Sequence, residues 1–286
     1  MKPLRARITA EAVRKKVPQP VIEKDYALSY ILAGISRQKS LKTSLVFKGG
    51  TALKKLFFGE YRFSEDLDYS AVNAPKGDDL ATALETAAQD SKRLMTEHGP
   101  FEVVFRRYEE REPHPHAQEA FTFHVQFPWH PSPLCRVKVE ISHDEPVVLP
   151  PLARSLIHGY EEKLTAKIQS YQLIEIMAEK LRTLLQTHKK LVTRGWNRPR
   201  VRDYYDLWRL FSRFGKTFNG EKLTPLLKKK CAHRQVVFKE ADDFFTKELL
   251  SEARTHWQST LGTFVDDLPP FEEAIQDLRH RLQGYF

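Results

Sequence analysis

The chain has 286 residues, and its 46 lysines and arginines against 37 aspartates and glutamates give a formal net charge of +9. Apolar residues make up 41% of it, which is enough for one large core or two smaller ones and argues against disorder. A run of about 18 apolar residues is absent, which excludes a transmembrane helix, and no apolar stretch follows the basic N-terminus as in a secretory signal. Two cysteines, Cys135 and Cys231, are too few for a disulfide framework, so we expect a cytoplasmic protein.

Hydrophobic periodicity changes in character near the proline pair at 150–151. Before it we expect, in chain order, a helix over 21–36, a strand over 45–47, a helix over 51–58, a strand over 62–72, a helix over 78–98, and strands over 101–108, 119–127 and 135–142. After it we expect helices over roughly 170–188, 201–214, 237–250 and 271–283. The sequence therefore predicts an α+β fold in two parts, a mixed-sheet core over 1–150 and a helical lobe over 151–286.

The positive charge is concentrated in the second part. Residues 1–150 carry 22 basic and 20 acidic side chains, whereas the window 180–234 carries 16 basic and 3 acidic ones. Such a block attracts phosphate groups through its field, although a solvated basic face is the alternative explanation. We take Arg194, Arg198 and Arg200, which lie in this window, as candidate RNA contacts.

Two carboxylates are the first candidate for chemistry. Asp66 and Asp68 stand two residues apart in an expected strand, so both project to the same face, and Leu67 projects to the other. Two like charges side by side repel unless a cation sits between them, and a hard ion such as Mg²⁺ is held by carboxylate oxygens. A solvated strand edge explains most isolated pairs of this kind.

A glycine turn lies fifteen residues upstream of the first aspartate. Lys48-Gly49-Gly50-Thr51 follows an expected strand and precedes an expected helix, a place where the backbone can approach a phosphate closely. An ordinary tight turn is the alternative, and the spacing of a Walker A loop is absent. Downstream, Glu140 on the polar face of the strand 135–142 could complete a metal site or act as a base, or it could simply pair with Lys138 or Arg136.

The string FKGGTALKKLFFGEYRFSEDLDYS resembles the signature of the AbiEii/MenT-type nucleotidyltransferase toxins, members of the DNA polymerase β-like nucleotidyltransferase superfamily. The upstream VIEKDYALSYIL is similar to that family's N-terminal helix, and EIMAEKLRTLLQ and RVRDYYDLWRL match two later motifs. The resemblance runs from about residue 20 to 212 and leaves out the C-terminal 70 residues. Four motifs in the right order are more specific than any one of them.

The resemblance implies a role for each matching residue of the first part. Gly50 and Thr51 would border the triphosphate of an NTP, in a turn that also includes Lys48 and Gly49. Asp66 and Asp68 would hold two Mg²⁺ ions, with Glu140 as the third acid. The resemblance further implies transfer of a nucleotide from an NTP to tRNA 3′ ends, by the toxin of a toxin–antitoxin pair with its cognate antitoxin as partner.

Lys180 and Asp203 are the candidates in the second part. Lys180 lies close to the apolar stripe of its helix, where a lysine needs a charged partner or ligand unless its stem snorkels to water. Asp203 lies in the first turn of the next helix, where a carboxylate also complements the helix dipole. The resemblance implies that Lys180 contacts the triphosphate and that Asp203 orients it or the base, with Asp206 as the alternative bearer.

Ser64 precedes Asp66 by two residues and shares its strand face if the strand begins that early. A phosphate there would compete with the incoming triphosphate, so we place Ser64 among the nucleotide-binding residues and state the hypothesis that its phosphorylation is an off-switch. The alternative is a serine that bonds its own backbone. Two further functions remain open: modification of a protein or small molecule on the same fold, and non-catalytic nucleic-acid binding.

Overall fold

The computed structural model describes residues 2–108, 117–218 and 220–286, and the chain divides into two compact units, Met1–Tyr171 and Gln172–Phe286. This boundary lies beyond the one expected at residue 150, because two short strands after the proline pair still add to the sheet of the first unit. None of the helices within the described ranges is long and apolar enough to cross a bilayer.

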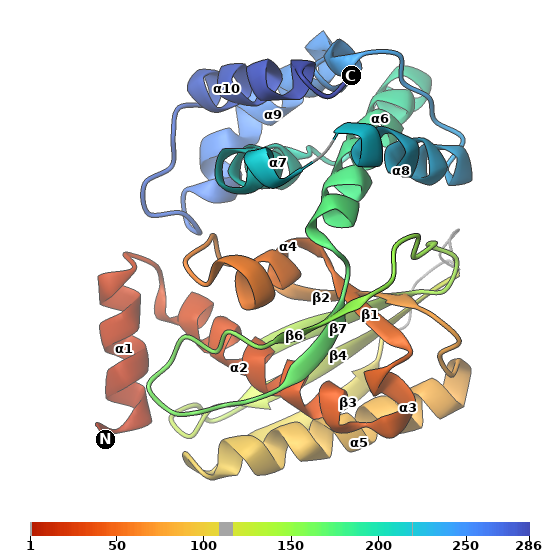
Figure 1. Cartoon of the computed structure of the whole chain (residues 1–286). Coiled ribbons are helices and arrows are strands. Elements are labelled where there is room, and N and C mark those ends of the chain that lie inside the picture. The colour runs from red at the N-terminus through yellow and green to blue at the C-terminus, as the bar shows by residue number, and fades with distance from the viewer. Residues whose placement is uncertain (1, 109–116, 219) are drawn as a thin grey trace. The chain divides into compact units, whose positions relative to one another are not determined.

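The first unit contains a mixed sheet. Within the described residues its seven strands have the order β3-β4-β5-β2-β1-β7-β6 (Figure 1). They are β1 (Leu45–Lys48), β2 (Asp66–Ala71), β3 (Glu102–Arg107), β4 (Gln118–Gln126), β5 (Cys135–Ser142), β6 (Leu152–Ser155) and β7 (Lys167–Ser170). Strand β2 is central, antiparallel to β1 and parallel to β5. The α+β prediction is therefore confirmed.

The helices of this unit are α1 (Leu4–Arg14), α2 (Gln19–Arg37), α3 (Lys39–Lys42), α4 (Gly49–Ala52) and α5 (Gly77–Thr96), and a π-helical turn, η1 (Leu53–Phe58), continues α4. Helices α2 and α5 lie on the same side of the sheet (Figure 1). The ring of Tyr26 in α2 packs 6.1 Å from that of Phe127, just after β4. Apolar and polar side chains alternate along β4 and β5, and the apolar ones form the sheet's part of this core. Phe121, Phe123 and Val139 are fully buried there.

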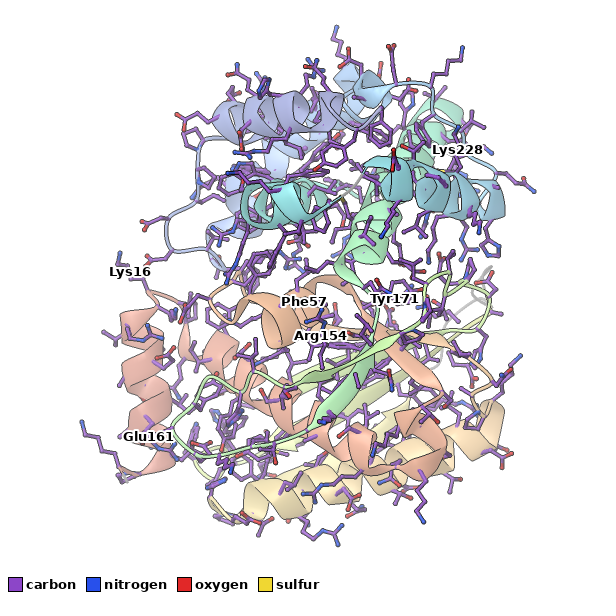
Figure 2. All side chains as sticks on the ribbon, viewed as in Figure 1. Lys16, Phe57, Arg154, Glu161, Tyr171 and Lys228 are labelled. Carbon is purple, nitrogen blue, oxygen red and sulfur yellow. The ribbon has the colours of Figure 1, made fainter. Side chains whose placement is uncertain are left out.

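The end of the sheet formed by β6 and β7 is held by side chains from distant segments. The guanidinium of Arg154 in β6 lies 4.2 Å from the ring centroid of Phe57 in η1 (Figure 2). The hydroxyls of Tyr171 and Ser70 lie 2.7 Å apart and link the residue after β7 to β2. These contacts attach the two short strands to the part of the sheet that bears the carboxylates.

The second unit is helical. Its helices are α6 (Leu173–Arg194), α7 (Val201–Phe214), α8 (Gly220–His233), α9 (Lys247–Leu261) and α10 (Phe271–Gln283), with 3₁₀ turns η2 (Gly215–Thr217) and η3 (Ala241–Phe244). The bounds predicted for α7 and α10 are confirmed, whereas the helix expected over 237–250 is wrong over 237–246, because helix α9 begins only at Lys247. Residues 237–246 instead include the 3₁₀ turn η3, where Glu240 and Asp243 cap each other's backbone before the chain enters α9.

Candidate active site

Strand β2 presents Asp66 and Asp68 on one face of the sheet. Both aspartates are half-buried, whereas Leu67 and Tyr69 between and after them are buried on the opposite face. This is the alternation that the sequence predicts, and it fixes the two carboxylates on the side of the sheet away from the apolar residues of β2. The pair is therefore accessible to a ligand from one side only.

Charged residues of the neighbouring strands flank the pair. Asp68 is in register with Lys48 of β1 on one side and with Glu140 of β5 on the other, and Asp66 is in register with Lys138. Lys138 Nζ donates to Glu140 Oε1 at 2.5 Å, which is the pairing that the surface interpretation of Glu140 expects. The sheet thus gathers carboxylates and ammonium groups in one row, as a site for a polyanion and its cations requires.

The glycine turn closes directly against this row. Gly49 has a left-handed φ of +81°, and a Cβ at this position would overlap the Asp68 carboxylate. A residue with a side chain would therefore be strained in its backbone and would displace the aspartate. Thr51 Oγ1 donates to the backbone carbonyl oxygen of Asp66 at 2.6 Å and ties the start of α4 to β2.

Arg62 is a candidate site residue that the sequence analysis missed. Its guanidinium is buried against Gly50, where an added Cβ would overlap its Nη2 atom. Nη1 donates to the carbonyl oxygen of Phe63 at 3.2 Å, which holds the side chain in place. A planar cation with several donors at a glycine turn suits a phosphate. The only signal in the sequence was an arginine four residues before Asp66.

The carboxylates suit Mg²⁺ only in part. Across the described ranges, no three histidine, cysteine, aspartate or glutamate side chains are grouped so that they could hold a metal ion. Magnesium keeps several waters and is commonly bound by one or two carboxylates together with substrate phosphates, so Asp66 and Asp68 fit an ion that is also bound to a nucleotide. The carboxylate of Glu140 is paired with Lys138, so its role as a third metal ligand stays a prediction.

Ser64 lies outside the strand. Because β2 begins at Asp66, Ser64 is in the connection that leads into it and is half-buried there. The shared strand face, which depended on an earlier start of the strand, is therefore not present. Its position two residues before the carboxylate pair is unchanged, and its role stays a prediction.

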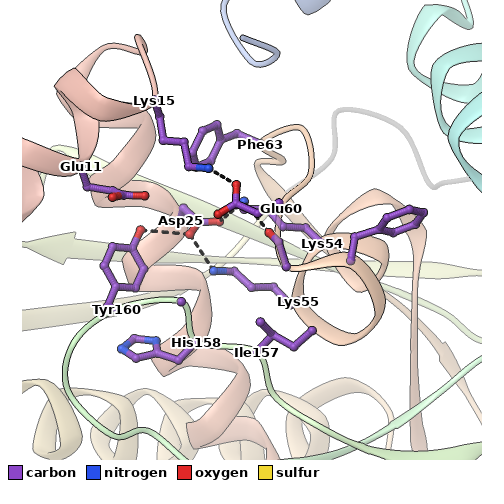
Figure 3. A pocket seen from close by; sticks show the side chains of 13 residues that line it. Glu11, Lys15, Asp25, Lys54, Lys55, Glu60, Phe63, Ile157, His158 and Tyr160 are labelled. Carbon is purple, nitrogen blue, oxygen red and sulfur yellow. Dashed lines mark hydrogen bonds and ion pairs between the residues drawn. The ribbon is translucent and has the colours of Figure 1, made fainter. Parts of the chain in front are cut away.

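A cavity of about 260 Å³ lies among α1, α2, η1 and residues 157–160 (Figure 3). At its wall the buried Lys55 Nζ contacts Asp25 Oδ2 at 2.7 Å, and the Tyr160 hydroxyl donates to the same oxygen at 3.0 Å. Lys54 lies 4.0 Å from Oδ1 of Asp25. This cluster ties the segment that follows the glycine turn to α2.

Burial and charge perturb both partners of this ion pair. Burial lowers the pKa of Lys55 to about 8, although the Asp25 charge opposes the shift. Burial would raise the pKa of Asp25, but the charges of Lys55 and Lys54 and hydrogen bonds from Lys55 and Tyr160 hold it below its ordinary value. Both groups are therefore charged at neutral pH, and each depends on the other.

In the second unit, Lys180 has the charged partners that its burial requires. Its side chain is almost fully buried, and Nζ lies 2.8 Å from Asp203 Oδ1 and 2.7 Å from Asp206 Oδ2. The side chain of Asp206 is 0% exposed and that of Asp203 is 17% exposed. A ligand can therefore reach Asp203 but not Asp206, which favours Asp203 as the functional aspartate.

The three arginines of the basic window differ in their surroundings. Arg194 and Arg198 are exposed near the end of α6 and in the connection to α7. Arg200 is half-buried: its Nε donates to Thr187 Oγ1 at 2.9 Å, and its Nη1 lies 3.9 Å from Asp203 Oδ2. Arg194 and Arg198 are thus available to a partner, whereas Arg200 has a structural role as well.

Comparisons with known proteins agree with this architecture. The family model described as "Nucleotidyl transferase AbiEii toxin, Type IV TA system" matches residues 30–277. No curated protein sequence matches the chain. Among solved structures, MenT4, the nucleotidyltransferase toxin Rv2826c from Mycobacterium tuberculosis H37Rv, is similar with a TM-score of 0.63 and 21% identity, over 97% of this chain and 88% of that chain. At this identity the likeness concerns the fold.

Proposed function

The chain belongs to the family of AbiEii nucleotidyltransferase toxins of type IV toxin–antitoxin systems, and from this premise we propose that it transfers a nucleotide from an NTP to the 3′ end of an RNA, with tRNA as the first candidate. Family membership implies a nucleotide substrate and an antitoxin partner. The observation that carries the proposal is the placement of Asp66 and Asp68 beside a glycine turn that has no room for a side chain.

The reaction is a displacement at phosphorus. The acceptor hydroxyl oxygen bonds to the α-phosphorus of the NTP, the bond from that phosphorus to the bridging oxygen breaks, and pyrophosphate leaves. Glu140 accepts the proton of the acceptor hydroxyl, after its carboxylate has left Lys138 and formed a hydrogen bond to that hydroxyl. The backbone at Gly49 and Gly50, the hydroxyl of Thr51 and the cations Lys48 and Arg62 bind and orient the triphosphate.

Asp66 and Asp68 would hold Mg²⁺ together with the triphosphate oxygens, and we expect two ions. Bound Mg²⁺ would neutralise charge that develops on the phosphates during transfer. Mg²⁺ would also offset the repulsion between the two half-buried carboxylates and the triphosphate, which is our reason for proposing a cation requirement. Transfer should accordingly stop on chelation of divalent ions and resume when Mg²⁺ is restored.

Lys180 and Asp203 serve the nucleotide in this proposal, Lys180 through contact with the triphosphate and Asp203 by orienting it or the base. The partial exposure of Asp203 supports a ligand-facing role for it. Arg194 and Arg198 contact phosphates of the RNA acceptor. Neutralising both should weaken RNA binding and flatten its salt dependence, while NTP binding changes less.

A protein or a small molecule as acceptor is the second candidate, and non-catalytic nucleic-acid binding is the third. The basic window of the second unit favours RNA over a protein or a small molecule as the acceptor, and NTP consumption separates transfer from simple nucleic-acid binding. One incubation separates them: the protein with Mg²⁺, each labelled NTP in turn, and total RNA or total protein from the same cells. Label in RNA supports the proposal, label in protein or a small molecule selects the second candidate, and no consumption of any NTP contradicts both.

A further inference from the structure

Trp196 is an aromatic residue on the surface of the second unit. Its side chain is 74% exposed, and Val192, in the last turn of α6, is 68% exposed. Leaving two such side chains in water forgoes the stabilisation that burial would give. An indole that is this exposed offers a flat apolar face on which a partner's aromatic ring can stack.

The connection between α6 and α7 holds Trp196 at a defined place. Helix α6 ends at Arg194, and the following Gly195 has a left-handed φ of +71° that reverses the chain, while its N–H donates to the Leu191 carbonyl oxygen at 2.9 Å. At the other end of the connection, Arg200 donates to Thr187 of α6 at 2.9 Å. Both ends are therefore anchored to one helix, and the indole lies between them.

The surroundings of the indole are strongly cationic. Residues 188–202 contain six lysines and arginines and no aspartate or glutamate. The crowding acts on Lys190, whose pKa is lowered by burial and then by the charges of Arg200, Arg194 and Arg182. Arg194 and Arg198, which flank the indole in the chain, are exposed. The segment thus combines an exposed aromatic ring with an exposed arginine two residues before it and another two residues after it.

We propose that Trp196 stacks on an unpaired base of the RNA acceptor while Arg194 and Arg198 contact the adjoining phosphates. A stacking face between cations suits single-stranded nucleic acid, because every base has a π-face and every linkage a phosphate. A base inside a duplex cannot be reached in this way, so the surface selects unpaired ends or loops. The inference deepens the proposed function and rests on its RNA acceptor.

The test is equilibrium binding of a labelled single-stranded RNA of about ten nucleotides by fluorescence anisotropy, without NTP. Trp196→Ala should weaken binding by about 5-fold to 150-fold, and Trp196→Phe should retain most of the affinity. The negative slope of log affinity against log salt should stay unchanged in Trp196→Ala. In the Arg194→Ala, Arg198→Ala double variant its magnitude should be smaller by about 1.4. Val13→Ala, which removes an equally exposed apolar group from the first unit, is the control and should bind normally.

An RNA of the same length without bases separates stacking from charge. The unaltered protein should bind it about as weakly as Trp196→Ala binds normal RNA, and Trp196→Ala should bind the two RNAs alike. Equal affinity of Trp196→Ala and the unaltered protein for normal RNA overturns the inference and leaves the proposed function standing. If Trp196→Ala instead binds RNA normally but no longer binds the cognate antitoxin, the surface is a protein-docking site. If the unaltered protein neither binds RNA nor transfers nucleotides to it, the proposed acceptor fails as well.

Discussion

Replacing Gly49 by alanine tests the contact between the glycine turn and the carboxylate pair, and Gly159→Ala is its matched control. The two glycines lie in the same unit with nearly equal φ, +81° and +79°. An alanine in this left-handed region costs roughly 1–2 kcal/mol, partly offset by about 0.4–1 kcal/mol because the unfolded chain loses freedom. Each variant should therefore unfold with a free energy about 1 kcal/mol below that of the unaltered protein.

The two variants should differ in activity. A Cβ at Gly159 meets nothing within 4 Å, whereas a Cβ at Gly49 overlaps Asp68 Oδ2 and lies 3.2 Å from its Cγ. The carboxylate is the far end of a flexible side chain, so its rotation relieves the overlap and moves it from its position against the turn. A displacement of about 1 Å in a reacting site can cost roughly 100-fold in rate. We expect that loss of nucleotide transfer in Gly49→Ala and none in Gly159→Ala.

The assay combines denaturant unfolding with transfer from a labelled NTP under saturating Mg²⁺. Equal transfer rates in the two variants would show that the position of Asp68 against the turn does not matter for the reaction. A Gly49→Ala protein that is inactive because it is unfolded would be recognised from the unfolding curve and would not count for either outcome.

Three further predictions follow from buried charges and from the serine. The pKa of Lys55 is about 8 in the folded chain and 10.5 ordinarily, so between these pH values the unfolded state binds more protons and the free energy of unfolding should rise with pH, by at most about 3 kcal/mol. The difference in unfolding free energy between the unaltered protein and Lys55→Met, measured across this pH range, should show this rise. Asp25→Asn should lower the unfolding free energy at pH 7 by about 3–5 kcal/mol. Asp203→Asn should reduce transfer with little change in the unfolding free energy, and Asp206→Asn should lower that free energy by several kcal/mol, about 3–5; the reverse order would exchange their roles. Ser64→Glu should transfer more slowly and bind NTP more weakly than Ser64→Ala, and equal kinetics would remove the off-switch hypothesis.

Local patterns predicted much of the fold. Strict alternation located β4 and β5, and one apolar stripe located α7, because each element buries one face of its own. The same reasoning missed β6 and β7, since their residues are largely polar or exposed and carry no apolar alternation. It also missed α8, whose pattern is interrupted by Pro225.

The candidate site was predictable where it depends on neighbours in the chain. The common face of Asp66 and Asp68 follows from the period of a strand, and the need of Lys180 for a charged partner follows from its place near an apolar stripe. Arg62 against Gly50 depends on the path of the loop before β2, and no spacing rule gives it. The salt bridge between Asp25 and Lys55 joins segments 30 residues apart and likewise emerges only from packing.

The central claim is that nucleotide transfer requires the carboxylates of Asp66 and Asp68, which we propose to hold Mg²⁺ with the triphosphate. Its most direct test is transfer from labelled NTP to RNA by Asp66→Asn and Asp68→Asn, beside Glu65→Gln as the control. Glu65 is the adjacent half-buried carboxylate, whose Oε1 lies 3.3 Å from Lys24 Nζ. The account predicts that both asparagine variants keep the fold and the unfolding free energy but lose transfer at any Mg²⁺ concentration, while Glu65→Gln transfers normally. Near-normal transfer by either asparagine variant with Mg²⁺ present would contradict the assignment of the site.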